Sequence, residues 1–353
     1  GLDAPAGVSL HQDSYVTLRG FRIQNWSGYG VALQQGSGCR VEECSFADNG
    51  LDMADAVHLV LLSSQTARVW HNRFEAGAER CLDDRATDSW ILGNRFSGCE
   101  ANAIKTGPHP AGAGGRIEHN VFGDNPAIQG VVSLDEVHGV TLQRNLILRG
   151  NHQGVVAENL WNCRILLNTI DSMAVGIDAF QMSDCRVEGN LLTHNVVAVV
   201  FETYLPDGLI DENLYFGNTA DSDGTGGPGA GELFADAQYL GWADDDLRID
   251  GGSPAENVGP QDLPVPEGGG GLVDLGAFEI GAGEAPWDYL MGPSVADLTP
   301  GLQWTYVDAT GGTQRAYRVQ LDRRPDFDSV DLLDSNWQES AQTSWTVPQA
   351  FGL

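Results

Sequence analysis

One short sequence pattern recurs about every 24 residues and limits the possible folds more than any other feature. It reads as an aliphatic residue, two variable positions, asparagine, one variable position and a large apolar residue. The copies with asparagine are Val69-Asn72-Phe74, Ile91-Asn94-Phe96, Ile117-Asn120-Phe122, Leu142-Asn145-Ile147, Ile165-Asn168-Ile170, Val187-Asn190-Leu192 and Ile210-Asn213-Tyr215. Two earlier copies, Leu18-Phe21-Ile23 and Val41-Cys44-Phe46, lack the asparagine. A fixed period of this length predicts a stack of similar units.

A second set of apolar residues runs in phase with the first, within short β-like stretches. Its members are Val8, Val31, Val57, Leu82, Ile104, Val132, Val156, Ile177 and Val199. A unit with two or three short strands cannot bury its apolar face alone, but stacked copies can. Asparagine at a fixed place suits a turn, because it tolerates left-handed backbone and can hydrogen-bond to the copies above and below. We therefore expect the seven asparagines to stack in one turn.

Together, the Asn-x-[Phe/Ile/Leu] and Gly-[Ile/Val]-x-[Leu/Val] patterns resemble the parallel β-helix repeats of pectate lyases and their relatives. The resemblance covers residues 5–218. It implies an all-β fold, a right-handed parallel β-helix that forms a solenoid of about nine coils. Leucine-rich repeats have a similar length and also use asparagine, but their additional spaced leucines are missing here. The repeats specify a fold and leave the chemistry open.

After the repeats, residues 221–231 read as a flexible loop or linker. Residues 232–283 then resemble the tail of many secreted bacterial β-helix proteins, with Ser253-Pro-Ala followed by Val273-Asp-Leu-Gly-Ala-Phe-Glu279. This tail departs from that pattern at Glu256-Asn257, where a hydrophobic residue and Asp are usual. We interpret it as the closing coil of a first domain that spans residues 1–283, since an open solenoid end needs a cap.

The last part of the chain, residues 286–353, alternates apolar and polar residues as half-buried strands do. It resembles the opening half of a fibronectin-III-like sandwich. Such sandwiches need about 100 residues, so we expect a partial β-sandwich with a domain boundary at Gly281–Pro286.

The charge and composition of the chain limit the kinds of molecule that it can bind. The formal net charge is −30, from 49 acidic and 19 basic residues, which opposes binding to nucleic acid and to anionic membranes. No apolar run approaches the ~20 residues of a membrane span. Gly1 leads directly into the repeat, and we expect it to be a processed or cut end. Six cysteines form no Cys-x-x-Cys pair, so we predict no zinc site. We expect a secreted or cell-surface monomer.

A candidate catalytic cluster follows from the repeat. If Val57, Leu82 and Ile104 point inward, the residues after them point outward and become neighbours on successive rungs, ~4.8 Å apart. Those residues are His58, Asp83 and Lys105, and Arg85 lies two positions beyond Asp83. A uronate lyase must neutralise the sugar carboxylate and remove a ring proton. Lys105 or His58 would be the base, and Arg85 would hold the carboxylate. The alternative is a ladder of solvent-exposed ion pairs with no catalytic role.

Three further residues are candidates for substrate binding. Asp135 lies in the outward column of Arg85, and His109 lies on the long turn Thr106–Gly115, which would wall a cleft. Asp84 would point inward unless the strand bends, in which case Asp83-Asp84 is a paired carboxylate.

The Asp83-Asp84 pair resembles the paired aspartates of polygalacturonases, although their Gly-His-Gly motif is absent here. The Asp-Pro-His-Glu motif of alginate epimerases is also missing. We predict no metal site and no required cofactor. Ca²⁺ is the alternative, suggested by the run Asp244-Asp245-Asp246, which lacks the alternate spacing of a calcium loop.

Two functions remain open. The first is a secreted carbohydrate-active protein that acts on a polysaccharide, preferably one containing uronate, by lyase or hydrolase chemistry. The second is a non-catalytic surface or adhesion stalk that binds a cell-surface glycan. The cluster of His58, Asp83, Arg85 and Lys105 favours the first, and the appended sandwich favours the second.

Overall fold

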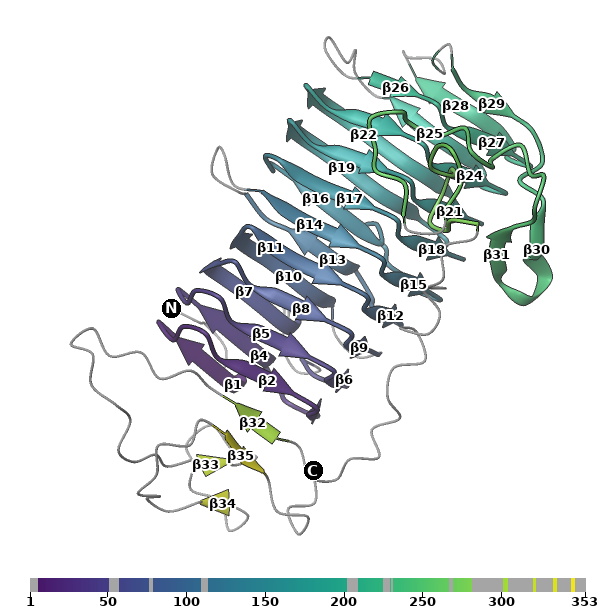
Figure 1. The fold of residues 1–353 in the computed structure, drawn as a ribbon. Coiled ribbons are helices and arrows are strands. Elements are labelled where there is room, and N and C mark those ends of the chain that lie inside the picture. The colour runs from purple at the N-terminus through teal and green to yellow at the C-terminus, as the bar shows by residue number, and fades with distance from the viewer. Residues whose placement is uncertain are drawn as a thin grey trace.

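The chain forms a right-handed parallel β-helix of about nine coils, seen here in a computed structural model (Figure 1). The structure describes residues 6–50, 57–75, 79–108, 114–201, 209–224, 229, 231–266 and 269–280, and four short strands after residue 300. Within these residues no helix has the length and apolarity that a membrane span requires. The fold predicted from the repeat is confirmed.

Each coil contributes one strand to each of three parallel sheets, which we name A, B and C. Sheet A contains β1 (Ala6–His11), β4 (Tyr29–Gln34), β7 (Val57–Gln65), β10 (Arg80–Thr87), β13 (Asn102–Thr106), β16 (Val132–Asp135), β19 (Gln153–Trp161), β22 (Val175–Ser183), β25 (Val197–Phe201) and β28 (Ala220–Gly224). Sheet B contains β2 (Thr17–Arg19), β5 (Arg40–Glu42), β8 (Arg68–Trp70), β11 (Ser89–Leu92), β14 (Gly115–Glu118), β17 (Val140–Gln143), β20 (Arg164–Leu166), β23 (Arg186–Glu188) and β26 (Leu209–Asp211). Sheet C contains β3 (Arg22–Gln24), β6 (Ser45–Ala47), β9 (Arg73–Phe74), β12 (Arg95–Ser97), β15 (Val121–Gly123), β18 (Leu146–Leu148), β21 (Thr169–Asp171), β24 (Leu191–Thr193), β27 (Leu214–Phe216) and β29 (Leu233–Phe234).

The seven repeat asparagines stack in the turn between sheets B and C, as predicted. Asn145 is representative: its Oδ1 accepts hydrogen bonds from the backbone N–H and the amide of Asn120, both at 3.0 Å. Its own amide donates to Oδ1 of Asn168 at 3.0 Å and to the carbonyl of Ile117 at 2.8 Å. The ladder ends at Glu232, whose carboxylate accepts from Asn213. Each asparagine thereby satisfies polar groups in the turn of the preceding coil.

The core is a stack of like side chains. Phe46, Phe74, Phe96 and Phe122 are fully buried, and their neighbouring ring centroids are 4.7 to 4.9 Å apart. These rings come from the last position of the repeat, so the same periodicity that fixes the turns also fills the interior.

The second apolar ladder was predicted one or two residues out of register in two coils. Leu59, not Val57, is the Cα partner of Leu82, and Val155, not Val156, is the partner of Val132. The error at Val57 is a shift of register by two residues within the same phase. The error at Val156 is one of phase, because Val155 and Val156 are both apolar and the alternation fits either. The first error moves a predicted site residue, as described below.

The closing segment adds β29 to the end of sheet C and then runs along the side of the helix (Figure 1). It includes the antiparallel pair β30 (Tyr239–Gly241) and β31 (Asp246–Ile249) and the single turn η1 (Trp242–Asp244). Its Leu247, Ala277 and Phe278 pack on Val121, Leu146 and Leu148 of sheet C. These outward residues of sheet C are apolar and need a cover, whereas Arg73 and Arg95 occupy the same column in earlier coils.

Residues 221–224, predicted as part of a loop, instead belong to β28 and extend sheet A. The predicted fibronectin-III-like sandwich over residues 286–353, and the boundary at Gly281–Pro286, fall almost entirely outside the described residues. Only β32 (Gly301–Gln303), β33 (Gln320–Leu321), β34 (Leu333–Asp334) and β35 (Ser344–Thr346) are described there. Strand β32 pairs antiparallel with β2 of sheet B and with β35.

Candidate functional site

The outer face of sheet A brings Asp83 and Lys105 together. They are Cα partners in the parallel pair β10–β13, and Ser133 of β16 is the next partner of Lys105. Each lies between two inward residues of its strand, such as Leu82 and Asp84 on either side of Asp83. The predicted adjacency of Asp83 and Lys105 on one outward face is therefore confirmed.

Asp83 is outward in register but buried, because two arginines cover it. The guanidinium of Arg85 donates to both carboxylate oxygens, through Nε at 3.0 Å and Nη2 at 2.8 Å. Nη1 of Arg80 lies 3.6 Å from the same carboxylate. This bidentate pairing holds Asp83 as a charged acceptor with both oxygens occupied. Two arginines and one lysine around one aspartate make the surroundings locally positive in a chain of net charge −30.

Arg85 reaches Asp83 by lying across the next coil. A side chain at Gly107 would place its Cβ 2.9 Å from Cγ of Arg85, so the glycine leaves room for the arginine to pass. About half of the Arg85 side chain remains exposed (49%). Lys105, on the same coil as Gly107, is half-buried. In the described part of the chain, no carboxylate lies within 4.0 Å of the Lys105 amine.

His58 does not belong to this cluster, which corrects the prediction. It is fully buried, and its ring lies between Phe46 and Phe74, with centroid distances of 6.3 and 6.4 Å. Its Nδ1 meets the amide of Asn49 at 3.0 Å, and its Nε2 meets the carbonyl of Glu75 at 2.6 Å. Burial lowers the pKa of His58 to about 4. Val60 takes the outward position beside Asp83, because alternation in β7 begins only at Leu59.

Asp84 is also structural, which corrects its assignment to substrate binding. Its carboxylate is buried within β10, just before the irregularity of that strand, where Oδ2 accepts from the hydroxyl of Ser89 at 2.5 Å and Oδ1 from the backbone N–H of Ala86 at 3.0 Å. The strand does bend there, but the bend directs Asp84 into the turn towards sheet B. Asp83 and Asp84 therefore face opposite sides and do not form a working carboxylate pair.

Asp135 takes the position in β16 that corresponds to Arg85 in β10, with Gly107 on the coil between them. Its Cα partner on the following coil is Glu158, one residue before the Asn159 that alternation alone suggests. Asp135 is half-buried. His109 lies outside the described residues, as does the middle of the turn that carries it.

Metal ligation finds no support in the described residues, where no group of three His, Cys, Asp or Glu side chains is placed to hold an ion. The acidic run that suggested Ca²⁺ is used in ion pairs. Asp245 pairs with Arg149, and Asp246 accepts two hydrogen bonds from Arg248, at 2.7 and 2.6 Å. Hydrogen bonding by Arg248 lowers the pKa of Asp246.

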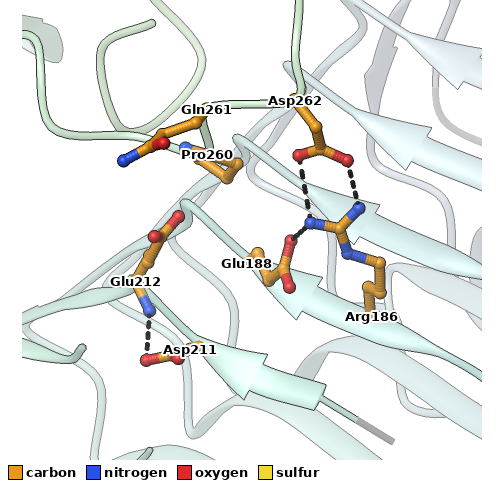
Figure 2. Close-up of a pocket in the computed structure, with 7 residues that line it drawn as sticks. All are labelled: Arg186, Glu188, Asp211, Glu212, Pro260, Gln261 and Asp262. Atoms are coloured by element: carbon orange, nitrogen blue, oxygen red, sulfur yellow. Dashed lines mark hydrogen bonds and ion pairs between the residues drawn. The ribbon is translucent and has the colours of Figure 1, made fainter. Parts of the chain in front are cut away.

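A pocket of about 240 Å³ lies elsewhere, where the closing segment crosses sheet B (Figure 2). It is lined by Arg186, Glu188, Asp211, Glu212, Pro260, Gln261 and Asp262. Arg186 bridges Glu188 of its own strand and Asp262 of the closing segment, the latter at 2.6 Å. Burial, and then the nearby carboxylates, raise the pKa of Glu212. We interpret this pocket as the junction that ties the closing segment to the helix.

Sequence reasoning missed one covalent feature beside the site. Cys81, on β10 two residues before Asp83, forms a disulfide with Cys99 of the following turn. Cys39, Cys44, Cys163 and Cys185 are buried free thiols. The available signal was that Cys81 and Cys99 lie 18 residues apart, within one period of the repeat. The contact of Arg80 with Asp83 was not predicted either.

Comparison with known proteins agrees with the fold. A family model described as "Right handed beta helix region" matches residues 6–204, more than half of the chain. Similar solved structures include the pectate lyase Pel9A, 13% identical, with a TM-score of 0.40 over 77% of this chain and 87% of that chain. An alginate lyase of family PL6, in complex with a trisaccharide, is 12% identical, with a TM-score of 0.33 over 71% and 87%. PfbA, a surface adhesin of Streptococcus pneumoniae, is 11% identical, with a TM-score of 0.31 over 60% and 62%. No curated protein matches the sequence.

Proposed function

We propose that this chain, which belongs to the right-handed β-helix family, acts on a uronate-containing polysaccharide at the outer face of sheet A by elimination. One observation carries the proposal: Lys105 adjoins Asp83 on neighbouring rungs, with the half-exposed Arg85 held beside them. A base and a fixed cation on one face are the two groups that elimination from a uronate requires.

The geometry favours a lyase over a hydrolase. Hydrolysis of a glycosidic bond by the usual route needs two carboxyl groups that flank it, one as acid and one as base or nucleophile. Here the Asp84 carboxylate is buried and bonded to Ser89, and both oxygens of Asp83 accept hydrogen bonds from Arg85. Elimination needs no such pair.

In the proposed reaction, the amine of Lys105 acts as the base and removes the proton on the ring carbon that carries the carboxylate. The electron pair of that C–H bond forms a carbon–carbon double bond, and the adjacent bond from carbon to the glycosidic oxygen breaks. The leaving oxygen takes a proton from water. Arg85 stabilises the charge that builds on the sugar carboxylate in the transition state. Asp83 keeps Arg85 in place, as a positioning residue.

The proposed activity also implies where the protein resides and what it binds. We propose a secreted or cell-surface protein, and the Cys81–Cys99 disulfide supports this, because such bonds persist mainly in oxidising compartments. The acidity of the chain disfavours nucleic acid as a partner. A polysaccharide or cell-surface glycan is the partner that fits the cationic surroundings of Lys105.

Lys105→Ala tests the chemistry. We expect turnover of a polyuronate, followed by the ultraviolet absorbance of the unsaturated product, to fall by about 10² to 10⁴-fold. The melting temperature should stay nearly the same, since Lys105 makes no ion pair in the described part of the chain. Lys105→Arg keeps the positive charge but removes a practical base, so it should lose turnover as well. Arg95→Gln, an exposed arginine on sheet C, is the control and should retain full activity.

The rival function is a non-catalytic stalk that binds glycans, and the bidentate Arg85–Asp83 pair favours it, because such a pair also stabilises a sheet by itself. Under this alternative the parent chain processes none of a panel of polyuronates. If the parent forms product and Lys105→Ala forms it at the same rate, Lys105 is not the base.

A further inference from the structure

Sheet B carries a column of arginines on its outer face. Successive Cα partners place one residue per coil at the same outward position, directly before the aliphatic residue of the repeat. These residues are Arg40, Arg68, Trp90, Arg116, Thr141, Arg164 and Arg186. We call them the arginine column. Five of the 19 basic residues of a chain with a net charge of −30 thus lie in one line along the helix axis.

Two tryptophans order the first part of the column. Arg40 and Arg68 lie over the ring of Trp70, at 5.6 and 5.1 Å from its centroid. Arg68 and Arg116 lie over the ring of Trp90, at 5.3 and 5.2 Å. Arg68, Trp90 and Arg116 therefore alternate along the axis, and Trp70 lies beside Arg68 on the same strand. A ring face holds the guanidinium groups of Arg40, Arg68 and Arg116 while their N–H edges stay available.

Most donors of the column are not used within the described chain. Arg40 and Arg116 have one carboxylate each, Glu42 and Glu118 of their own strands, at 3.7 Å. These contacts are longer than charge-assisted hydrogen bonds, which measure about 2.7–2.9 Å. The side chains of Arg40 and Arg116 are 43% and 55% exposed. Arg68 and the exposed Arg164 have no hydrogen-bonded or ion-paired carboxylate in the part of the chain that the structure describes.

The column has a defined extent. At its far end, Arg186 is engaged by Glu188 and by Asp262 of the closing segment (Figure 2). The open part therefore runs from Arg40 to Arg164, over six coils. Successive positions are separated by the strand spacing of ~4.8 Å.

We propose that the open part of the arginine column binds a linear polyanionic glycan that lies along the helix axis. A sugar residue in an extended glycan advances by a length close to the spacing of the coils. Arg68, Arg116 and Arg164 lie two coils apart, with Trp90 and Thr141 between them, so carboxylates on alternate sugars meet one guanidinium after another. Planar guanidinium groups bind carboxylates in a bidentate manner. This surface is on a different sheet from Lys105 and does not depend on any chemistry at sheet A.

Charge selects the class of ligand. Guanidinium groups in a line complement a polymer with regularly placed anions, and the tryptophan faces are occupied by arginines and not open for neutral sugars. Nucleic acid is also a regular polyanion, but its high charge density is opposed by the net charge of −30 on the rest of the chain.

The experiment measures the Kd of the full chain for a linear oligogalacturonate and for its methyl-esterified, uncharged counterpart. Arg164→Gln removes a cation of the column that makes no contact with tryptophan. The double change Arg68→Gln with Arg116→Gln removes two cations from the stack. Arg95→Gln on sheet C is the matched control, because it removes the same charge from another exposed face.

We expect Arg164→Gln to weaken binding about tenfold and the double variant about a hundredfold, the loss of one and two charge-assisted contacts. Arg95→Gln should bind within about twofold of the parent, and Lys105→Ala should bind the glycan fully while losing turnover. If the double variant unfolds, the affinity of Arg164→Gln alone tests the proposal.

Parental affinity in Arg164→Gln would overturn the proposal, as would equal binding of the uncharged oligomer by the parent chain. Binding lost in Lys105→Ala but kept in the column variants would assign the glycan to sheet A alone. Tighter binding of single-stranded RNA than of oligogalacturonate would show that the class of ligand is wrong.

Discussion

The inside of the helix and the outer face of sheet A follow opposite rules. Inside, each coil repeats its neighbour, as in the stacked rings of Phe46, Phe74 and Phe96 and the asparagine ladder. Outside, every coil differs. The outward column of sheet A reads Ser9, Ala32, Val60, Asp83, Lys105, Ser133, Val156, Asp178, Val200 and Asp223. A change inside should therefore disturb three coils at once, and a change outside should remain local.

Asn145→Ala should have the largest effect on stability, because it breaks the ladder in its middle. It leaves the buried N–H and amide of Asn120 without their acceptor, and the carbonyl of Ile117 without its donor. Each unsatisfied buried polar group costs about 1–3 kcal/mol, so we expect a loss of about 4 kcal/mol in the free energy of unfolding. Urea unfolding measures it, with the exposed Asn151→Ala as the control. A loss below about 1 kcal/mol would mean that the coils do not depend on one another.

His58 tests the same contrast by pH, since the structure moves it from the outside to the inside. Burial lowers its pKa in the folded chain to about 4, whereas an unperturbed histidine has a pKa of 6.5. Between these values the unfolded chain binds the extra proton. Stability contributed by neutral His58 is therefore complete above pH 6.5 and is lost as the pH falls towards 4, by on the order of 3 kcal/mol.

The measurement compares pH profiles of the unfolding free energy for the parent, His58→Gln and His11→Gln, where His11 is exposed. We expect His58→Gln to remove the decline between pH 6.5 and 4, and His11→Gln to retain it. Carboxylates that titrate in this range affect all three proteins alike, so they cancel in the difference. Identical profiles for the parent and His58→Gln would place His58 on the outside after all.

The same contrast explains how far the sequence could be interpreted. The interior was predictable because packing selects the same residue types at every coil, so periodicity reports directly on position. The outside was predictable only where the phase of a strand is unambiguous, as at Leu82-Asp83 and Ile104-Lys105. In β7 the inward residues Leu59 and Leu61 share the phase that was predicted from Val57, but the register lies two residues later and His58 precedes the alternating part of the strand. The prediction for Asp84 was wrong for another reason. The hydroxyl of Ser89, five residues away, donates a hydrogen bond to its buried carboxylate.

The arginine column shows a signal that was present but not used. Arginine directly precedes the aliphatic residue at Arg40-Val41, Arg68-Val69, Arg116-Ile117, Arg164-Ile165 and Arg186-Val187. The repeat is defined by the residues that it buries, and the arginine lies at an outward position beside them. Reading outward positions of every sheet in register would have found the column.

Asp178→Asn should have the smallest effect on the free energy of unfolding, because it changes an outward residue that has few partners. Asp178 occupies the same outward column as Asp83, three coils from Lys105, but it is half-buried and accepts only a long hydrogen bond from Gln153, at 3.4 Å. Surface changes away from networks stay within about 0.5 kcal/mol. Because the chain carries a net charge of −30, loss of one negative charge should be neutral or slightly stabilising.

The matched change Asp83→Asn should cost more, about 2 kcal/mol, because it removes the negative charge and one of the two acceptor oxygens that face Arg85 and Arg80. The two variants delete the same charge from the same column, so the difference in their urea midpoints isolates the local pairing. Added NaCl should shrink the effect of Asp178→Asn, since salt screens exposed charges over ~10 Å, and should leave that of Asp83→Asn nearly intact. Equal effects at both positions would mean that the Asp83 pairs do not hold in solution, and the positioning of Arg85 would fall with them.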